Sequence, residues 1–130
     1  MIFGKRKPEE PGPLGERLAA EFLRKRGFKI LRRNCRSQLG EIDLIAREGD
    51  EVVFIEVKTR TGTTWGDPAE AVSPSKQRKL SLTALGFAEQ NKLREHPLRF
   101  DVIAVVLRAE GEPEITHYPN AFPLHRSLRG

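Results

Sequence analysis

The sequence predicts a single α/β domain in which a mixed β-sheet is flanked by α-helices. Its patterns run in the order helix, strand, two strands around a tight turn, helix, strand and strand, which is the order expected of such a layered domain. The run at 99–107 is apolar almost throughout, which is typical of a strand buried on both faces. A length of 130 residues provides for one hydrophobic core and therefore for one domain.

The N-terminal part of the chain divides into an arm and a helix. Residues 1–13 combine prolines with charged side chains, and we predict a flexible arm there, followed by a single domain at 14–130. Apolar residues then recur at helical spacing, so a helix is predicted over 14–26, with Gly27 as its C-terminal cap. Glu16 falls in the opening turn of this helix, where the helix dipole alone would explain an acidic residue.

A β-hairpin is the central prediction. A first strand at 28–31 leads into two β-branched runs, 40–46 and 51–58, and these flank a Gly-Asp turn at 49–50. Because side chains alternate along a strand, one face of the hairpin carries no charge and belongs in the core. The residues of that face are Ile42, Leu44, Ala46, Val53, Ile55 and Val57.

The opposite face of the hairpin is charged at the end away from the turn. Counting back from a two-residue turn at 49–50 places Asp43 directly opposite Glu56, and it places Glu41 opposite Lys58. Two facing carboxylates repel each other and destabilise a sheet unless positive charge lies between them. The alternative is structural: a Glu41–Lys58 cross-strand salt bridge, with Asp43 and Glu56 as edge charges that discourage aggregation.

This charged face suits a divalent cation such as Mg²⁺ or Mn²⁺. Hard cations take oxygen ligands, often one or two carboxylates completed by water and substrate phosphate. A lysine beside them can hold a phosphate oxygen or position a water molecule. The residues therefore predict metal-assisted hydrolysis of a phosphodiester bond.

The elements after the hairpin are a loop, a helix and two strands. The Gly- and Thr-rich loop at 61–68 carries the only tryptophan, Trp65, which could stack on a base but more commonly packs against its own domain. Ser73 and Pro74 are typical of a helix start. A strand at 99–107 contains Asp101, to which we assign a structural pairing with a basic side chain rather than metal ligation, and a short strand at 115–118 follows.

The motifs resemble those of a known nuclease superfamily. Gly40-Glu41-Ile42-Asp43 followed by Glu56-Val57-Lys58 resembles the PD-(D/E)XK signature, particularly as written in archaeal Holliday-junction resolvases, although Ile42 stands where the superfamily name has proline. From Leu14 to about Phe122 the chain resembles the YraN family of bacterial proteins (UPF0102). The further motifs that carry this resemblance are Gly15-Glu16-x-x-Ala19, Lys76-Gln77 and Phe100-Asp101-Val102.

This resemblance implies a restriction-endonuclease-like fold and a set of site residues. Asp43 and Glu56 would bind the cation, with the Val57 carbonyl as a further ligand, and Lys58 would orient the nucleophile. The resemblance adds Glu16 and Gln77 as accessory catalytic residues, although from sequence alone Gln77 is a surface residue.

The charge balance predicts an acidic partner. A formal net charge of +5 and an isoelectric point near 9.7 favour a nucleic acid, with DNA preferred over RNA. Any one basic cluster could equally serve as a solvated helix face. The residues predicted to contact nucleic acid are Arg36, Arg60, Trp65, Lys76 and Arg78.

The remaining composition narrows the class of protein. The single Cys35 forms no internal disulfide, and the three histidines lack metal-ligand spacing. No apolar run is long enough for a signal peptide or a membrane helix, so a cytoplasmic protein is predicted. Symmetric cutting of two strands would favour a homodimer. Two alternatives to the nuclease are a nucleic-acid-binding module without cleavage and an interaction subunit of a DNA-processing complex.

Overall fold

The computed structural model describes residues 11–62 and 72–124. Among these residues a five-stranded sheet has the order β1-β2-β3-β4-β5, in which only the β3–β4 pair is parallel. The described fold confirms the predicted α/β class with a mixed sheet flanked by helices. Its elements are α1 (Pro11–Lys25), β1 (Lys29–Ser37), β2 (Gly40–Glu48), β3 (Glu51–Thr61), α2 (Pro74–Gln90), β4 (Leu98–Leu107) and β5 (Glu114–Phe122).

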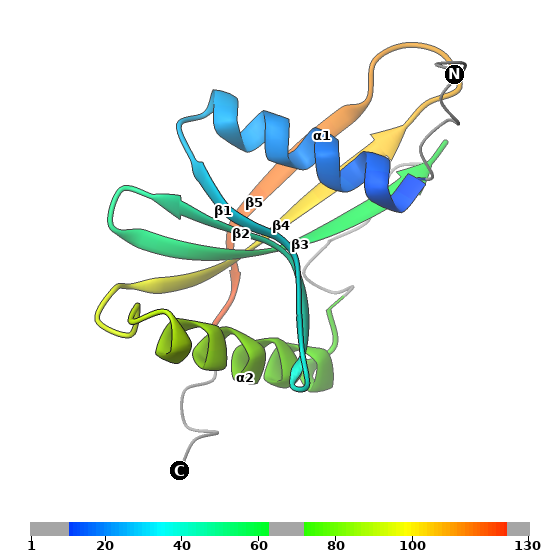
Figure 1. Ribbon diagram of the computed structural model, residues 1–130. Coiled ribbons are helices and arrows are strands. Elements are labelled where there is room, and N and C mark those ends of the chain that lie inside the picture. Colours follow the sequence, from blue (N-terminus) through cyan, green and yellow to red (C-terminus); the bar gives the residue numbers. More distant parts are fainter. Residues whose placement is uncertain (1–10, 63–71, 125–130) are drawn as a thin grey trace, which may run out of the picture.

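The two helices cover opposite faces of the sheet, so the protein has two hydrophobic layers (Figure 1). Helix α1 packs its Ala19, Ala20 and Leu23 on one face, and α2 packs Leu80 and Ala84 on the other. Strand β4 lies between β3 and β5 and is buried from Phe100 to Val106, as its continuous apolar run predicts.

Helix α1 begins earlier than the sequence indicated. It starts at Pro11, so residues 11–13 are helical and not part of a flexible arm, while residues 1–10 lie outside the described part. Proline is well accommodated in the first turn of a helix because no intrahelical partner is lost there, which explains how Pro11 and Pro13 fit. Glu16 therefore lies in the second turn, and the helix dipole accounts less well for its position than we expected.

Strand β1 is longer than predicted and forms a second hairpin with β2. It runs to Ser37, whereas the sequence suggested a strand only at 28–31, because the arginine-rich stretch after it lacks apolar alternation. Asn34 has a positive φ of 56° in the middle of β1, and the β1–β2 register places it opposite Asp43. Asparagine tolerates this left-handed conformation, and the β1–β2 hairpin bends toward α2 (Figure 1).

The bend changes which face Ile42 occupies. By strict alternation Ile42 would join Leu44 on the α1 side, as we predicted, but it packs in the α2 layer with Ile45 and Leu80. Leu44 and the other members of the predicted uncharged face do lie in the α1 layer, with Val57 half-buried against it. The prediction was thus correct for the face as a whole and wrong for Ile42, because alternation holds only along an unbent strand.

The β2–β3 hairpin has the predicted register near its turn. Glu48 pairs with Glu51, and the ladder continues to the Leu44–Ile55 pair, where it ends. Beyond that pair the β1–β2 hairpin leaves the sheet and lies against α2 (Figure 1). The predicted Glu41–Lys58 pair therefore does not form.

Two glycines allow the tip of the β1–β2 hairpin to contact α2 closely. A Cβ atom on Gly40 would lie 2.8 Å from Thr83 Oγ1, and one on Gly86 would lie 3.1 Å from Leu39 Cδ1. Gly40 also has a positive φ of 148°. The backbone of Gly40 in the hairpin therefore lies against the Thr83 side chain of α2. The backbone of Gly86 in α2 likewise lies against the Leu39 side chain of the hairpin.

Asp101 is a structural residue, as its position in the sequence predicted. Its carboxylate is fully buried and accepts hydrogen bonds from Arg99 Nε at 2.8 Å, from His117 Nε2 at 2.7 Å and from the Asn120 backbone N–H at 2.9 Å. Burial alone would raise the pKa of Asp101, but these donors, His117 foremost, hold it below its ordinary value. The buried charge is therefore fully compensated.

Gly15 fixes the distance between α1 and the sheet. A Cβ atom at this position would lie 1.9 Å from Thr59 Oγ1, which is far inside van der Waals contact, so only glycine allows α1 to cross β3 here. Thr59 follows Lys58 directly, and Glu16 follows Gly15. The close crossing thus brings Glu16 toward the charged end of β3.

We expect Gly15→Ala to lower the free energy of unfolding by about 1–3 kcal/mol, because the overlap with Thr59 outweighs the better helix propensity of alanine. Gly12→Ala is the matched control, since nothing lies within 4 Å of a Cβ on Gly12 in the same helix. Urea denaturation measures both, and adding Thr59→Ala should recover part of the loss. Equal stability of the two glycine variants would refute the tight crossing.

Candidate active site

The site lies where β2 and β3 separate. Once the ladder ends at Leu44–Ile55, Asp43 no longer pairs through its backbone, and its Oδ2 atom instead accepts the backbone N–H of Val57 at 2.8 Å. Glu56, only 9% exposed, lies beside it on β3. The structure thus brings Asp43 and Glu56 together. The hydrogen bond that Asp43 accepts from Val57 takes the place of the next backbone pair in the β2–β3 ladder.

The carboxyl groups of Asp43 and Glu56 interact directly, and their pKa values move in opposite directions. Burial and the charge of Glu56 raise the pKa of Asp43 to about 7, although the Val57 N–H opposes this change. Burial would also raise the pKa of Glu56, but Lys76 and Lys58, together with a hydrogen bond from Asp43, lower it below its ordinary value. The protonated form of Asp43 is therefore favoured up to about pH 7, whereas Glu56 is favoured in its ionised form.

Two lysines from different elements neutralise Glu56. Lys58, two residues along β3, places its Nζ atom 3.2 Å from Glu56 Oε2. Lys76, in the first turn of α2, contacts the same oxygen with its own Nζ atom. Burial alone would lower the pKa of Lys76, but the hydrogen bond to Glu56 raises it, so this ammonium stays charged. Glu56 therefore forms ion pairs with both lysines of the site.

Glu16 is near this cluster without contacting it through a hydrogen bond or ion pair in the described structure. Partial burial raises the pKa of Glu16, and the charges of Glu41 and Glu56 add to that effect while Arg33 and Arg36 oppose it. Arg36 Nε itself lies 3.4 Å from Glu41 Oε2 in an exposed pair. Glu41 thus pairs along the β1–β2 hairpin and not with Lys58.

Four further residues were predicted for the site or its nucleic-acid contacts, namely Gln77, Arg60, Arg78 and Trp65. Gln77 donates from Nε2 to the Val72 carbonyl at 2.9 Å, so its amide holds the chain that leads into α2 and does not contact a carboxylate. Arg60 and Arg78 are exposed on β3 and α2. Trp65 lies outside the described residues. The accessory role that the resemblance gives to Gln77 stays a prediction.

Sequence reasoning missed the contact of Lys76 with Glu56. We assigned Lys76 to phosphate binding because it lies at a helix start that Ser73 caps, and the cap itself is confirmed. A signal was present: Lys76 is four residues before Leu80 and eight before Ala84, on the helix face that packs against the sheet. A lysine on that stripe is directed toward the strands.

The donor set fits a small hard cation. A cation between Asp43 and Glu56 would take the place of the proton on Asp43, and one or two carboxylates with water and phosphate are a common magnesium shell. Within residues 11–62 and 72–124, no group of three or more His, Cys, Asp or Glu side chains is arranged to hold a metal ion. A site of this kind would therefore depend on water and substrate oxygens to complete the shell.

Fold and site together define an α/β protein with a carboxylate–lysine cluster at the open end of a mixed sheet. The family model described as Uncharacterised protein family UPF0102 matches residues 15–105. The chain belongs to this family, which confirms the family resemblance seen in its motifs.

Bacterial relatives extend over nearly the whole chain. A UPF0102 protein of Geotalea daltonii is 46% identical over 121 residues, which is 93% of this chain and 95% of the relative. A UPF0102 protein of Rhodococcus opacus is 47% identical over 111 residues, covering 85% and 94%. Among solved structures, the chain is similar to one in the structure of an EndoMS–dsDNA complex, with a TM-score of 0.41 and 15% identity over 85% of this chain and 42% of that one.

None of the described helices is long and apolar enough to cross a membrane.

Proposed function

We propose that this protein is a metal-dependent nuclease that hydrolyses phosphodiester bonds in DNA, including branched or structured DNA. The observation that carries the proposal is the buried Asp43–Glu56 carboxylate pair, in which Lys58 and Lys76 both contact Glu56 Oε2. A buried carboxylate held protonated near neutral pH is a costly arrangement for a structural role alone. The net charge of +5 supports a polyanionic substrate.

Each side chain has a definite part in this proposal. Asp43 and Glu56 would hold Mg²⁺ or Mn²⁺, with the Val57 carbonyl as a further ligand. When bound, such a cation acidifies a water molecule and offsets charge on the phosphate. Lys58, whose Nζ atom lies 3.2 Å from Glu56 Oε2, would then orient the attacking water.

Lys76 would act on the substrate phosphate. Lys76 contacts Glu56 in the metal-free protein, and with a cation held by that carboxylate its ammonium would be available to an oxygen of the scissile phosphate. Its side chain is 43% exposed, which gives it access to a ligand outside the site. Glu16, whose pKa is raised by partial burial near the cluster, would assist by accepting a hydrogen bond from a water molecule.

A second candidate function is a nucleic-acid-binding module without cleavage. Lys58 and Lys76 already balance Glu56 without any metal, so the cluster is stable as a structural unit. A third candidate function is that of an interaction subunit of a DNA-processing complex. These functions differ in whether cleavage, binding alone, or neither is measured with the purified protein.

The test is a cleavage and binding assay on labelled linear, flapped and four-way DNA with Mg²⁺ or Mn²⁺. We expect binding that weakens steeply with added salt, because phosphate contacts release counterions. Cleavage should be lost in Asp43→Asn and Glu56→Gln and fall about 10²–10³-fold in Lys58→Met, which removes a charge at the reacting centre. Cleavage that persists in both carboxylate variants would contradict the assigned site, and the absence of nucleic-acid binding at low salt would contradict the function.

A further inference from the structure

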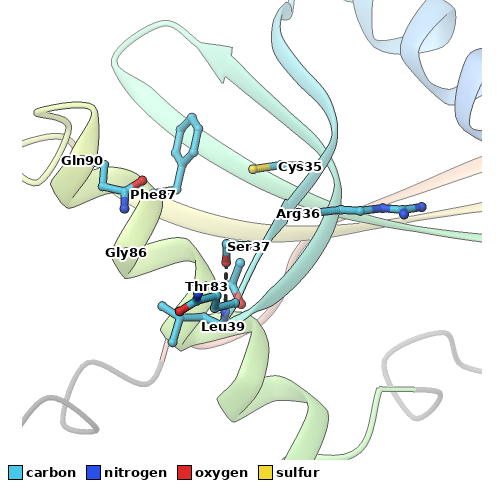
Figure 2. A pocket seen from close by; sticks show the side chains of 9 residues that line it. Cys35, Arg36, Ser37, Leu39, Thr83, Gly86, Phe87 and Gln90 are labelled. Atoms are coloured by element: carbon cyan, nitrogen blue, oxygen red, sulfur yellow. Dashed lines mark hydrogen bonds between the residues drawn. The ribbon is translucent and has the colours of Figure 1, made fainter.

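The large apolar side chains that remain exposed in the described part of the chain form one patch. Leu39, at the tip of the β1–β2 hairpin, is 52% exposed, and Leu82, on α2, is 36% exposed. Both line a hollow of about 260 Å³, which Leu85, Gly86 and Glu89 complete from α2. In Figure 2 the Leu39 side chain reaches from the hairpin tip to α2, on which Gly86 lies close by. We call the five residues that line this hollow the Leu39–Leu82 patch.

The patch lies on a stripe along the outer side of α2. Lys79, Leu82, Gly86 and Glu89 follow one another at intervals of three, four and three residues, which keeps them on one face of a helix. The buried side chains of α2 lie on its other side, against the sheet. Lys79, Leu82 and Glu89 are exposed and Gly86 is half-buried, so the stripe is accessible to a partner. Exposed apolar side chains with charges at the rim are typical of a surface that binds another protein.

The stripe is complementary to its own reversed copy. Its midpoint is position 84, and a two-fold axis there would set α2 of a second copy antiparallel across the first. Leu82 would then face Gly86 of the second copy, and Lys79 would face Glu89 of the second copy. Because the axis is two-fold, each of these contacts forms twice. An apolar side chain thus meets a hollow, and each charge meets the opposite charge.

Gly86 allows the close approach that this arrangement needs. It places no side chain between the two helices, and the distance between packed helices depends on the side chains at their contact. The hollow beside it has room for the incoming leucine, since removal of a leucine side chain from a core leaves a cavity of about 150 Å³. Leu39 lies against the same glycine, so the hairpin tip borders the contact on one side.

We infer that the Leu39–Leu82 patch joins two copies of this chain in a two-fold dimer with antiparallel α2 helices. A second copy suits the surface because the stripe contains the partner for each of its own charges, in reverse order along the helix. A contact of one helix and one hairpin tip is small beside the roughly 800 Å² that each partner buries in a stable complex. The dimer should therefore be reversible, with a dissociation constant on the order of 10–100 µM. It involves neither Asp43 nor Glu56, so it does not rest on the proposed function.

Sedimentation velocity of the purified protein from about 1 to about 500 µM measures this association. At about 50 mM salt, where surface charges are less screened, the average mass of wild type should rise from one chain toward two. Leu82→Glu places a charge in the hollow of each partner and should raise the dissociation constant at least about tenfold. Because Leu82 is exposed on the single chain, this variant should keep a near-normal melting temperature at low concentration.

A charge exchange tests the antiparallel pairing. Lys79→Glu or Glu89→Lys alone sets like charges against each other across the two-fold axis and should weaken the dimer about tenfold. In an equimolar mixture of the two variants every pair is again Glu against Lys, so the mixture should associate about as well as wild type. The matched control is Lys29→Glu, which makes the same charge change as Lys79→Glu at the exposed start of β1 and should dimerise as wild type does.

A wild type that stays monomeric at the highest concentration would overturn this inference and leave the patch to a different partner. The inference also fails if Leu82→Glu dimerises as well as wild type. It fails as well if the mixture of the two charge variants associates no more tightly than each variant does alone. Cleavage and nucleic-acid binding decide the proposed function separately, so failure of the dimer and failure of that function are distinguishable.

Discussion

We expect Asp101→Asn to produce the largest loss of stability of any single substitution discussed here, about 3–5 kcal/mol at neutral pH. The substitution removes the charge that Arg99 and His117 face, and it leaves the guanidinium of Arg99, whose side chain is 13% exposed, without its fully buried counterion. Glu51 would retain one contact to Arg99 at 2.7 Å, which limits the loss but does not replace the buried carboxylate. Chemical denaturation of the two proteins measures the difference.

The pH dependence of this difference has a definite sign. The pKa of Asp101 is lowered in the folded protein, so its stabilisation is present above the ordinary aspartate range and is lost as the pH falls through the folded value. The destabilisation by Asp101→Asn should therefore shrink in acid. Glu51→Gln is the control, because its side chain is 41% exposed and its removal should cost less than about 1 kcal/mol. If Asp101→Asn costs no more than this control, the buried network is not the anchor that its geometry indicates.

The second large effect has the opposite sign. In the metal-free protein Asp43→Asn should be stabilising, because it removes a buried carboxylate whose ionisation is unfavourable beside Glu56. An asparagine can still accept the Val57 N–H and can donate to Glu56 in place of the protonated aspartate. The substitution thus keeps the contacts of the protonated aspartate but has no carboxyl group that could ionise.

This second effect should grow with pH. The pKa of Asp43 is raised to about 7, so the folded protein retains a proton that the unfolded chain releases, and wild type loses stability as the pH rises through about 7. Between pH 5 and pH 8 the stability of Asp43→Asn relative to wild type should increase by about 1–3 kcal/mol. Thermal or urea unfolding in chelator across this pH range checks it, and a difference independent of pH would show that Asp43 is ionised throughout.

Local sequence rules predicted the parts of the fold in which neighbouring residues decide the geometry. A two-residue turn at 49–50 fixed the β2–β3 register, and Ser73 with Pro74 fixed the start of α2. The continuous apolar run of β4 correctly indicated a central strand. In each case the deciding interactions lie within a few residues of one another, so no knowledge of the tertiary structure was needed.

The features that sequence reasoning missed depend on contacts between distant elements. The bend at Asn34 directs the β1–β2 hairpin onto α2, and it explains why Ile42 changed layers. Strand β1 is stabilised by pairing with β2 even though its arginines lack alternation. Lys76 contacts Glu56 because α2 covers the face of the sheet on which Phe54, two residues before Glu56, is packed. Tertiary packing decides such positions, and one sequence carries only indirect signs of it.

The pairing of Asp43 with Glu56 was predictable, but the state of the pair was not. Counting the register from the turn predicted that the two carboxylates would lie together, and they do so although the ladder ends one pair earlier. Their opposite pKa shifts depend on burial and on two lysines from different elements. That combination is also what makes the site suitable for a cation, which would take the place of the proton on Asp43.

Melting temperatures in chelator and in magnesium at pH 8 decide whether Asp43 and Glu56 hold a divalent cation. A cation that binds only the folded state stabilises it by mass action, by about 2.7 kcal/mol at one hundred times its dissociation constant. We expect wild type to gain stability from magnesium, Asp43→Asn to be more stable than wild type in chelator and insensitive to magnesium, and the exposed control Glu41→Gln to respond as wild type does. A destabilised Asp43→Asn together with no effect of magnesium on wild type would contradict the account.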